Sequence, residues 1–205
     1  MSAFLGPIHI MMYDRILYQD KMTLTLLKLA AEKDPDSRLS DYIDTETPAA
    51  SKQSLDLIID ESNIHDWLSK AVSICEERFA MTVSSILEKS SANLEELCDA
   101  MKALGRTCGI PIPPDAEQAF QNLHSILLDG MPCDFPFVTT NSDQELVSWH
   151  VANCPHTPHW TGKGCSGDIY YQLRDAWMEG ALENSKISHS RTDPYMHQLK
   201  RSSES

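Results

Sequence analysis

The sequence predicts a mainly helical α+β protein, a bundle of four to five helices with one β-hairpin. Apolar residues recur at helical spacing in the first 130 residues, and a later stretch is instead rich in aromatic and β-branched residues. The length of 205 residues fits one domain, and 41% hydrophobic residues suffice for a core. We expect a helical bundle over 1–130. A β-hairpin, a Cys/His loop and a final helix should pack on it over 131–183, followed by a polar flexible tail over 184–205.

Helical spacing and breaker residues define four helices in the bundle. The first starts at Gly6-Pro7, because proline loses no hydrogen bond at the first helical position. The polar stretch 34–51 contains proline and is expected to be a loop. The next helix is expected to break near 60–63, where Asp, Ser and Asn offer a new N-cap. The expected helices span 7–32, 52–89, 93–104 and 114–128.

The pattern changes after residue 134. The runs 135–140 and 145–151 are rich in aromatic and β-branched residues and are separated by a short polar turn, which predicts a β-hairpin. Pro136 favours an edge position for the first strand. A last helix is expected over 168–182, and the polar residues after it lack a period, which predicts a mobile tail.

Charge excludes several classes of partner. The net charge of −13 disfavours a nucleic-acid surface and an anionic membrane, because both need clustered Lys and Arg. No apolar run reaches ~18 residues, and the N-terminus has no signal-peptide shape. We therefore expect a cytoplasmic protein whose six cysteines are thiols or metal ligands rather than disulfides.

The richest candidate segment runs from Cys154 to Cys165. It reads Cys-Pro-His-Thr-Pro-His-Trp before a glycine-containing stretch, too rich in proline and glycine for a regular helix. Thiolates and imidazoles are ligands for zinc and iron, so Cys154 and His156 are candidate metal ligands. The spacing is not that of a zinc finger. The alternative is a proline-rich surface loop with scattered histidines and free thiols.

Two further histidines occur in similar surroundings. His9 and His65 each follow an isoleucine near the start of a long helix, and an acid, Asp20 or Glu76, stands eleven residues later. This internal repeat predicts that the two imidazoles lie at similar depth in the bundle. They could bind a metal or a haem iron between the helices, or hydrogen-bond to loop carbonyls. The Glu-x-x-His and His-Glu-x-x-His metal motifs are absent.

Cys133 completes the candidate set. It lies in Gly130-Met131-Pro132-Cys133-Asp134, after a predicted helix end. It could be a ligand or a nucleophile at the mouth of the site, although the sequence shows no nearby group to lower its pKa. The alternative is a plain turn into the first strand.

Residues 125–182 resemble the small-molecule-binding modules of the vinyl-reductase and aminothiazoline-carboxylate-hydrolase type. The resemblance covers under a third of the chain and is carried by Gly130–Phe135, Cys154-Pro155, Gly164-Cys165 and Arg174–Leu182. Such modules place a β-hairpin beside helices, and some hold zinc through cysteines. The resemblance therefore implies Cys133, Cys154 and Cys165 as site residues.

The leading hypothesis is a cytoplasmic metal-binding protein that holds zinc or iron in a buried His/Cys site. Such an ion could act on a small apolar molecule in hydrolase-like chemistry. The alternatives are a ligand-binding or assembly subunit without chemistry, which binds a partner protein or a second copy of itself, and a haem protein with two histidine ligands. The predicted metal ligands are His9, His65, Cys133, Cys154 and His156.

Overall fold

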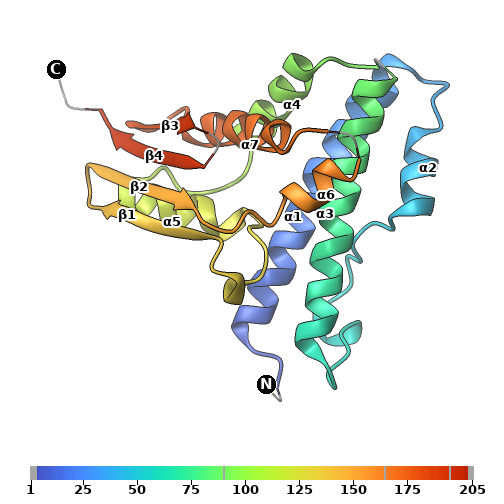
Figure 1. The fold of residues 1–205 in the computed structure, drawn as a ribbon, viewed down its shortest axis with the longest axis horizontal. Helices are drawn as coiled ribbons and strands as arrows, with labels where there is room; N and C mark the ends of the chain where they lie inside the picture. The colour runs from blue at the N-terminus through green and yellow to red at the C-terminus, as the bar shows by residue number, and fades with distance from the viewer. Residues whose placement is uncertain (1–3, 90, 164, 194, 203–205) are drawn as a thin grey trace.

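Two long helices, α1 (Pro7–Lys33) and α3 (Ile64–Glu88), form the spine of the fold (Figure 1). They lie side by side and run in the same direction, because the chain returns along their flank between them. The computed structural model describes residues 4–89, 91–163, 165–193 and 195–202. The expected break near 60–63 is confirmed, since only a short 3₁₀ turn, Leu55–Leu57, precedes α3.

The returning segment contains a helix that the sequence did not predict. The stretch 34–51 was expected to be a loop, but α2 (Leu39–Glu46) occupies part of it. Arg78 of α3 holds this helix in place. Its guanidinium donates to the carboxylates of Asp20 at 2.9 Å and Asp44 at 2.6 Å, and to the carbonyl oxygen of Thr47 at 2.5 Å. The buried pair of Asp20 and Arg78 joins α1 to α3, and the remaining donors of Arg78 hold α2 against them through Asp44 and Thr47.

Beside the spine, α4 (Leu94–Arg106) packs on α7 (Gly167–Leu182) at very close range. Two glycines make this approach possible. A methyl group on Gly105 would overlap the carbonyl oxygen of Trp177, and one on Gly180 would overlap the carbonyl oxygen of Lys102. The backbones of the two helices therefore touch at the height of these glycines.

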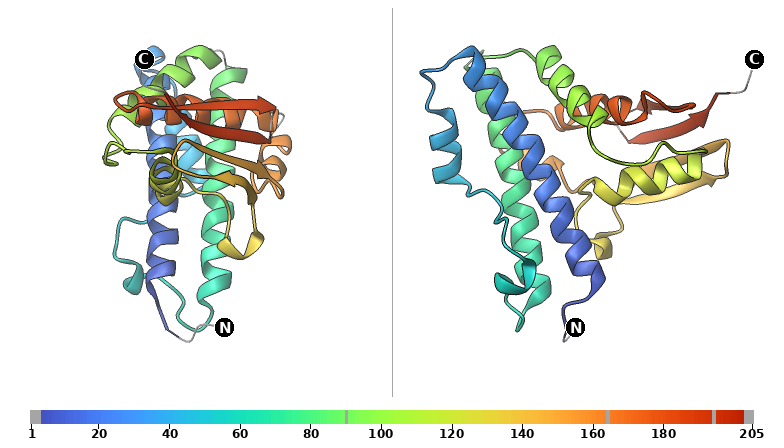
Figure 2. Two further views of the ribbon diagram at one scale, coloured as in Figure 1. Left: turned by 90° about the vertical axis from the view of Figure 1, so that its left-hand side faces the viewer. Right: turned by 180° about the vertical axis from the view of Figure 1, so that it is seen from behind.

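A four-stranded antiparallel sheet in the order β1-β2-β4-β3 completes the fold. The expected hairpin is confirmed as β1 (Phe137–Ser142) and β2 (Leu146–Val151). The expected flexible tail over 184–205 is wrong for most of its length, because β3 (Ile187–Asp193) and β4 (Met196–Arg201) form a second hairpin. Alternate residues of β2 and β4 are buried, and the sheet packs against α5 (Ala116–Ile126) and α7. Figure 2 shows α5, in yellow-green, lying along the sheet.

The predicted α+β class is confirmed, with more elements than expected. The described residues form seven α-helices, where four or five were expected, and four strands, where two were expected. The Cys/His loop itself contains a short helix, α6 (Thr157–Thr161), although its prolines and glycines predicted irregular backbone. A second 3₁₀ turn, Pro132–Asp134, precedes β1. None of the helices in the described part of the chain is both long enough and apolar enough to span a membrane.

Candidate metal centre

Three side chains from the C-terminal half form the one group of potential metal ligands found among the described residues. They are Asp175 of α7, His189 of β3 and His197 of β4, and their ligand atoms all lie within 4.8 Å of one another. In a tetrahedral zinc site the ligand atoms lie roughly 3.3–3.6 Å apart, because each bond is about 2.0–2.2 Å long. Small side-chain adjustments would therefore bring this group to coordination distance.

The second hairpin places both imidazoles on the inner face of the sheet. Side chains alternate between the faces of a strand, so His197 points inward together with Leu199, and His189 lies on the neighbouring strand opposite Leu199. The ring of Trp149 stacks on His197 at a centroid distance of 5.1 Å. The centre is thus held by regular strands and by a buried aromatic ring rather than by a loop.

Two buried polar atoms of this group have no hydrogen-bond partner among the described residues. Nε2 of His189 lies 3.2 Å from Nδ1 of His197, which leaves Nε2 of His197 without a hydrogen bond among the described residues. Arg191 donates to Oδ2 of Asp175 at 2.6 Å, while Oδ1 is buried, lies 3.9 Å from Nδ1 of His189 and has no hydrogen bond within the same residues. Buried polar atoms without partners are rare in folded proteins and are common where an ion or a water binds.

Burial keeps both imidazoles neutral. Burial, together with the charges of Arg174 and Arg191, lowers the pKa of His189 to about 3. Burial and the charge of Arg174 lower the pKa of His197 to about 2. Burial also raises the pKa of Asp175, although Arg191 opposes this shift. A neutral imidazole is the form that coordinates a metal, so no proton has to leave either ring at neutral pH.

A cleft of about 640 Å³ opens beside Asp175 and His189. More of its wall is polar than apolar, four of its lining residues are acidic, and Arg191 is the one cationic side chain among the described residues that line it. Arg191 forms ion pairs with both Asp175 and Asp168, each with a hydrogen bond of 2.6 Å. The ligand group is therefore accessible to a small polar molecule. The lining residues are Cys98, Asp168, Gln172, Asp175, Ala176, Glu179, His189, Ser190, Arg191 and Asp193.

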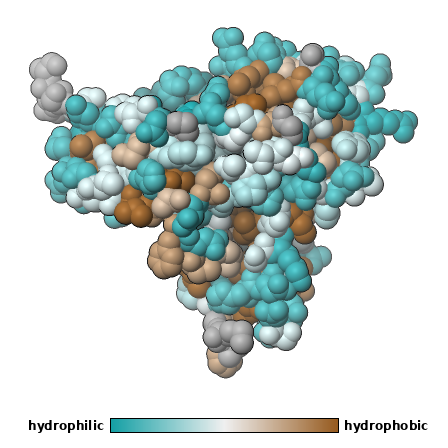
Figure 3. Space-filling view, in the orientation of Figure 1, coloured by the Kyte–Doolittle hydropathy of each residue, from teal (hydrophilic) through white to brown (hydrophobic). Residues whose placement is uncertain are grey.

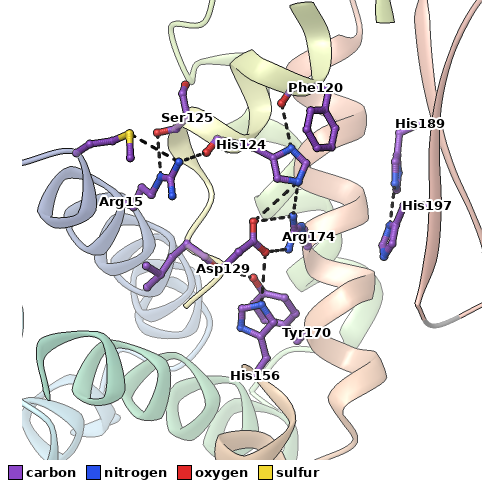
Figure 4. Close-up of polar contacts among 12 residues, drawn as sticks. Arg15, Phe120, His124, Ser125, Asp129, His156, Tyr170, Arg174, His189 and His197 are labelled. Atoms are coloured by element: carbon purple, nitrogen blue, oxygen red, sulfur yellow. Dashed lines mark hydrogen bonds and ion pairs between the residues drawn. The ribbon is translucent and has the colours of Figure 1, made fainter. Parts of the chain in front are cut away.

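A second, fully buried group of charges lies on the other side of α7 (Figure 4). Nδ1 of His156 lies 3.0 Å from the carboxylate of Glu76, and its Nε2 lies 3.8 Å from Asp129. The carboxylate of Asp129 accepts hydrogen bonds from both terminal nitrogens of Arg174. Arg174 also lies 3.4 Å from Nε2 of His124. We call these five residues the buried charge network; it joins α3, α5, α6 and α7.

The network shifts the pKa of each histidine in a different direction. Burial opposes a charge on His156, but the carboxylates of Glu76 and Asp129 outweigh it and raise its pKa to about 9. Burial lowers the pKa of His124 to about 4, despite the charge of Asp129. Burial alone would raise the pKa of Asp129, but Arg174 and His156 hold it well below its usual range. At neutral pH, His156 is therefore a cation and His124 is neutral.

We expect the charge on His156 to make stability fall between pH 6.5 and 9. Its folded pKa of about 9 exceeds the unfolded value, so its contribution is complete below pH 6.5 and disappears as pH rises to 9. The lost stability should be on the order of 3 kcal/mol. Urea unfolding should show that the difference in the free energy of unfolding between the wild type and His156→Gln becomes smaller as pH rises over this interval. The control His150→Gln, at an exposed position of β2, should show the same pH dependence of stability as the wild type. A difference between His156→Gln and the wild type that stays constant with pH would contradict the raised pKa of His156.

The histidines of the predicted repeat do lie together, but without the other predicted ligands. The rings of His9 and His65 meet edge to face with centroids 5.5 Å apart. His9 is buried whereas His65 is exposed, so the expectation that both imidazoles lie at similar depth is wrong. Nδ1 of His9 accepts a hydrogen bond from the backbone N–H of Gly6 at 2.9 Å. This bond caps the start of α1. The expectation of a hydrogen bond to a loop carbonyl is also incorrect for this nitrogen, because its partner is an N–H group.

The remaining predicted ligands are dispersed. His156 belongs to the buried charge network, and Cys133 is exposed on the turn before β1. Burial raises the pKa of Cys154, but hydrogen bonds from Thr157 and Tyr171 outweigh it, so the thiol pKa is lowered. The five predicted ligands therefore do not form one centre within the described residues. The prediction of a single buried His/Cys site is wrong in its geometry.

The actual ligand group was missed because its histidines lie in a segment that looks like a polar tail. Ile187, His189 and Arg191 alternate with small or polar residues, as do His197 and Leu199. Counting histidine as an inward-facing residue would have revealed the period of two that marks a strand.

The chain matches no protein-family model, no curated protein and no solved structure.

Proposed function

We propose that this protein binds a divalent transition-metal ion through Asp175, His189 and His197. The observation that carries the proposal is the convergence of two neutral imidazoles and one carboxylate within 4.8 Å, with buried atoms on Asp175 and His197 that lack a hydrogen bond among the described residues. Two imidazoles and one carboxylate suit zinc and ferrous iron. Zinc or iron thus remains the proposed metal, at a centre other than the predicted one.

The cleft supports an open rather than a closed metal centre. A structural zinc site is enclosed by four protein ligands, whereas a catalytic site has three and keeps a position for water or substrate. Three ligands beside a cleft of about 640 Å³ follow the second pattern. An ion there would polarise a bound group or activate water. The polar wall favours a small polar substrate over the apolar one expected from the sequence.

Metal titration of tag-free protein tests the proposal. After treatment with EDTA, the protein should bind about one equivalent of Zn²⁺, and Co²⁺ should give visible bands of a low-coordinate site. Asp175→Asn, His189→Gln and His197→Gln should each weaken Zn²⁺ binding by roughly tenfold to a hundredfold or more. Thermal melts would verify that each variant is folded. The matched control is His150→Gln, on the outer face of the same sheet.

The same titration separates the alternatives. Unchanged Zn²⁺ binding in all three variants, or binding lost in a His9→Gln/His65→Gln double variant instead, would overturn the proposed centre. A Soret band in protein as purified would indicate haem. Protein that binds no metal and elutes as an oligomer or with a partner would favour an assembly subunit.

We further propose a cytoplasmic location. All six cysteines are free, as expected in a reducing compartment. Fractionation of cells that produce the protein would test this location.

A further inference from the structure

A second cavity, of about 290 Å³, lies where the start of α1, the end of α5 and the segment 129–137 meet. Most of its wall is apolar. Figure 3 shows apolar atoms gathered below the sheet, over the segment that joins α5 to β1. We call this cavity the Arg15 pocket. Its lining residues are Ile8, Met11, Arg15, His124, Asp129, Gly130, Pro132, Phe135, Pro136 and Phe137.

Arg15 enters this apolar wall without a carboxylate partner. Its guanidinium donates to the carbonyl oxygens of His124 at 2.5 Å and Ser125 at 3.5 Å, as Figure 4 shows. Its other contacts are with two methionine sulfurs at 3.8 and 3.9 Å, which are weak acceptors. The ion pairs that arginines form among the described residues do not include Arg15, although the charge of Asp129 acts on it from beyond ion-pair distance. A guanidinium has five N–H groups. Two donate to the carbonyl oxygens, two contact only the sulfurs, and one on Nη1 has no acceptor among these contacts, so a carboxylate that displaces the sulfurs could accept hydrogen bonds from both terminal nitrogens.

The floor of the Arg15 pocket adds no net negative charge. Asp129 lines it, but this carboxylate is already paired with Arg174 and faces the protonated His156. Glu76 balances His156 from the other side. Asp129 therefore offsets the charges of its own network, and Arg15 has no ion-pair partner of its own among the described residues, in a chain of net charge −13. A local positive potential inside an apolar cavity attracts small anions.

Phe135 forms the outer wall in an unusual conformation. Its φ of 47° and ψ of 60° are left-handed, which is rare for a bulky residue. The side chain is 74% exposed, so burial does not stabilise this conformation. Such strain is concentrated at binding and catalytic sites. Phe137, two residues later, lines the same pocket.

The geometry points to a binding site for a small carboxylic acid with an aromatic or apolar body. The carboxylate binds Arg15 through paired N–H donors, the strongest arrangement for this pair. The body lies on the apolar wall and beside Phe135 and Phe137. The site is separate from Asp175, His189 and His197, and it does not require the proposed metal.

Binding of simple aromatic acids to the full chain tests this site. The probes are benzoate, phenylacetate and 3-phenylpropionate, each compared with its neutral amide by calorimetry at low salt. At least one acid should bind saturably, and roughly tenfold or more tighter than its amide. Arg15→Gln should weaken the binding of that acid by about the same factor. The control Arg38→Gln, at an exposed arginine at the start of α2, should leave its binding unchanged.

Phe135→Ala provides a test that does not touch α1. Because this side chain is mostly exposed, the variant should keep the wild-type melting temperature and still bind the acid several-fold more weakly. The proposal is overturned if none of the acids binds with a Kd below about 10 mM. It is equally overturned if binding survives both Arg15→Gln and Phe135→Ala, or if acid and amide bind alike. Adding Zn²⁺ should not be needed for binding, which keeps this result independent of the metal titration.

Discussion

Arg174→Met should lower the free energy of unfolding by about 3–5 kcal/mol, one of the two largest effects that we expect. The side chain is 4% exposed and holds the carboxylate of Asp129 with both terminal nitrogens. Methionine fills similar space but leaves the buried carboxylate of Asp129 with His156 at 3.8 Å and the neutral His124 at 3.9 Å. Removing one member of a buried ion pair is far more harmful than replacing both, because the remaining charge has lost its compensation.

Urea unfolding with a double-mutant cycle measures this effect. Asp129→Asn in the same chain should recover part of the loss, since the uncompensated charge is then absent. Arg106→Met breaks an exposed ion pair with Glu183 and should leave the urea midpoint nearly unchanged. Equal midpoints for Arg174→Met and the wild type would show that the buried charge network contributes little to stability.

Gly180→Ala should lower the free energy of unfolding by about 3 kcal/mol or more, and Gly105→Ala by a similar amount. In each case the new methyl group would overlap a backbone carbonyl of the facing helix, and backbone cannot rotate away as a side chain can. The helices α4 and α7 would have to separate, which opens the core along their whole contact.

Gly162→Ala is the matched control. A methyl group there would meet only ordinary contacts, the nearest at 3.4 Å from the carbonyl oxygen of Pro158, and its φ of −63° suits alanine. It should therefore change the urea midpoint little. A Gly180→Ala variant as stable as the wild type would mean that α4 and α7 do not approach as closely as described.

The sequence predicts those elements whose buried positions are apolar. The spacing of Met12, Ile16, Leu68 and Val72 was enough for the two long helices, and alternation was enough for the first hairpin. Local sequence patterns did not predict α2, because this polar segment is held in place by an ion pair with Arg78, which lies on a helix distant in the sequence. Such a contact has no trace in the periodicity of the segment itself.

The candidate metal centre could not be predicted for a related reason. Two of its inward positions on β3 and β4 are filled by His189 and His197, which leaves Ile187 and Leu199 as too few apolar residues to show the alternation of a strand. Conversely, His156 stood in the segment richest in ligand types, yet it forms an ion pair with Glu76, 80 residues away. Residue types and local spacing identify the chemistry that is available, but they do not identify the partner that a fold brings to each group.

The second hairpin has a consequence for truncated forms of this protein. Removing the residues after α7 would delete two of the three proposed metal ligands and would also leave β2 as an open edge, since β4 pairs with it from Leu146 to His150. The inner face of β2 carries Val147 and Trp149, which β4 and its side chains now help to cover. An unpaired, apolar strand of this kind recruits other chains. Shortened chains should therefore aggregate through β2.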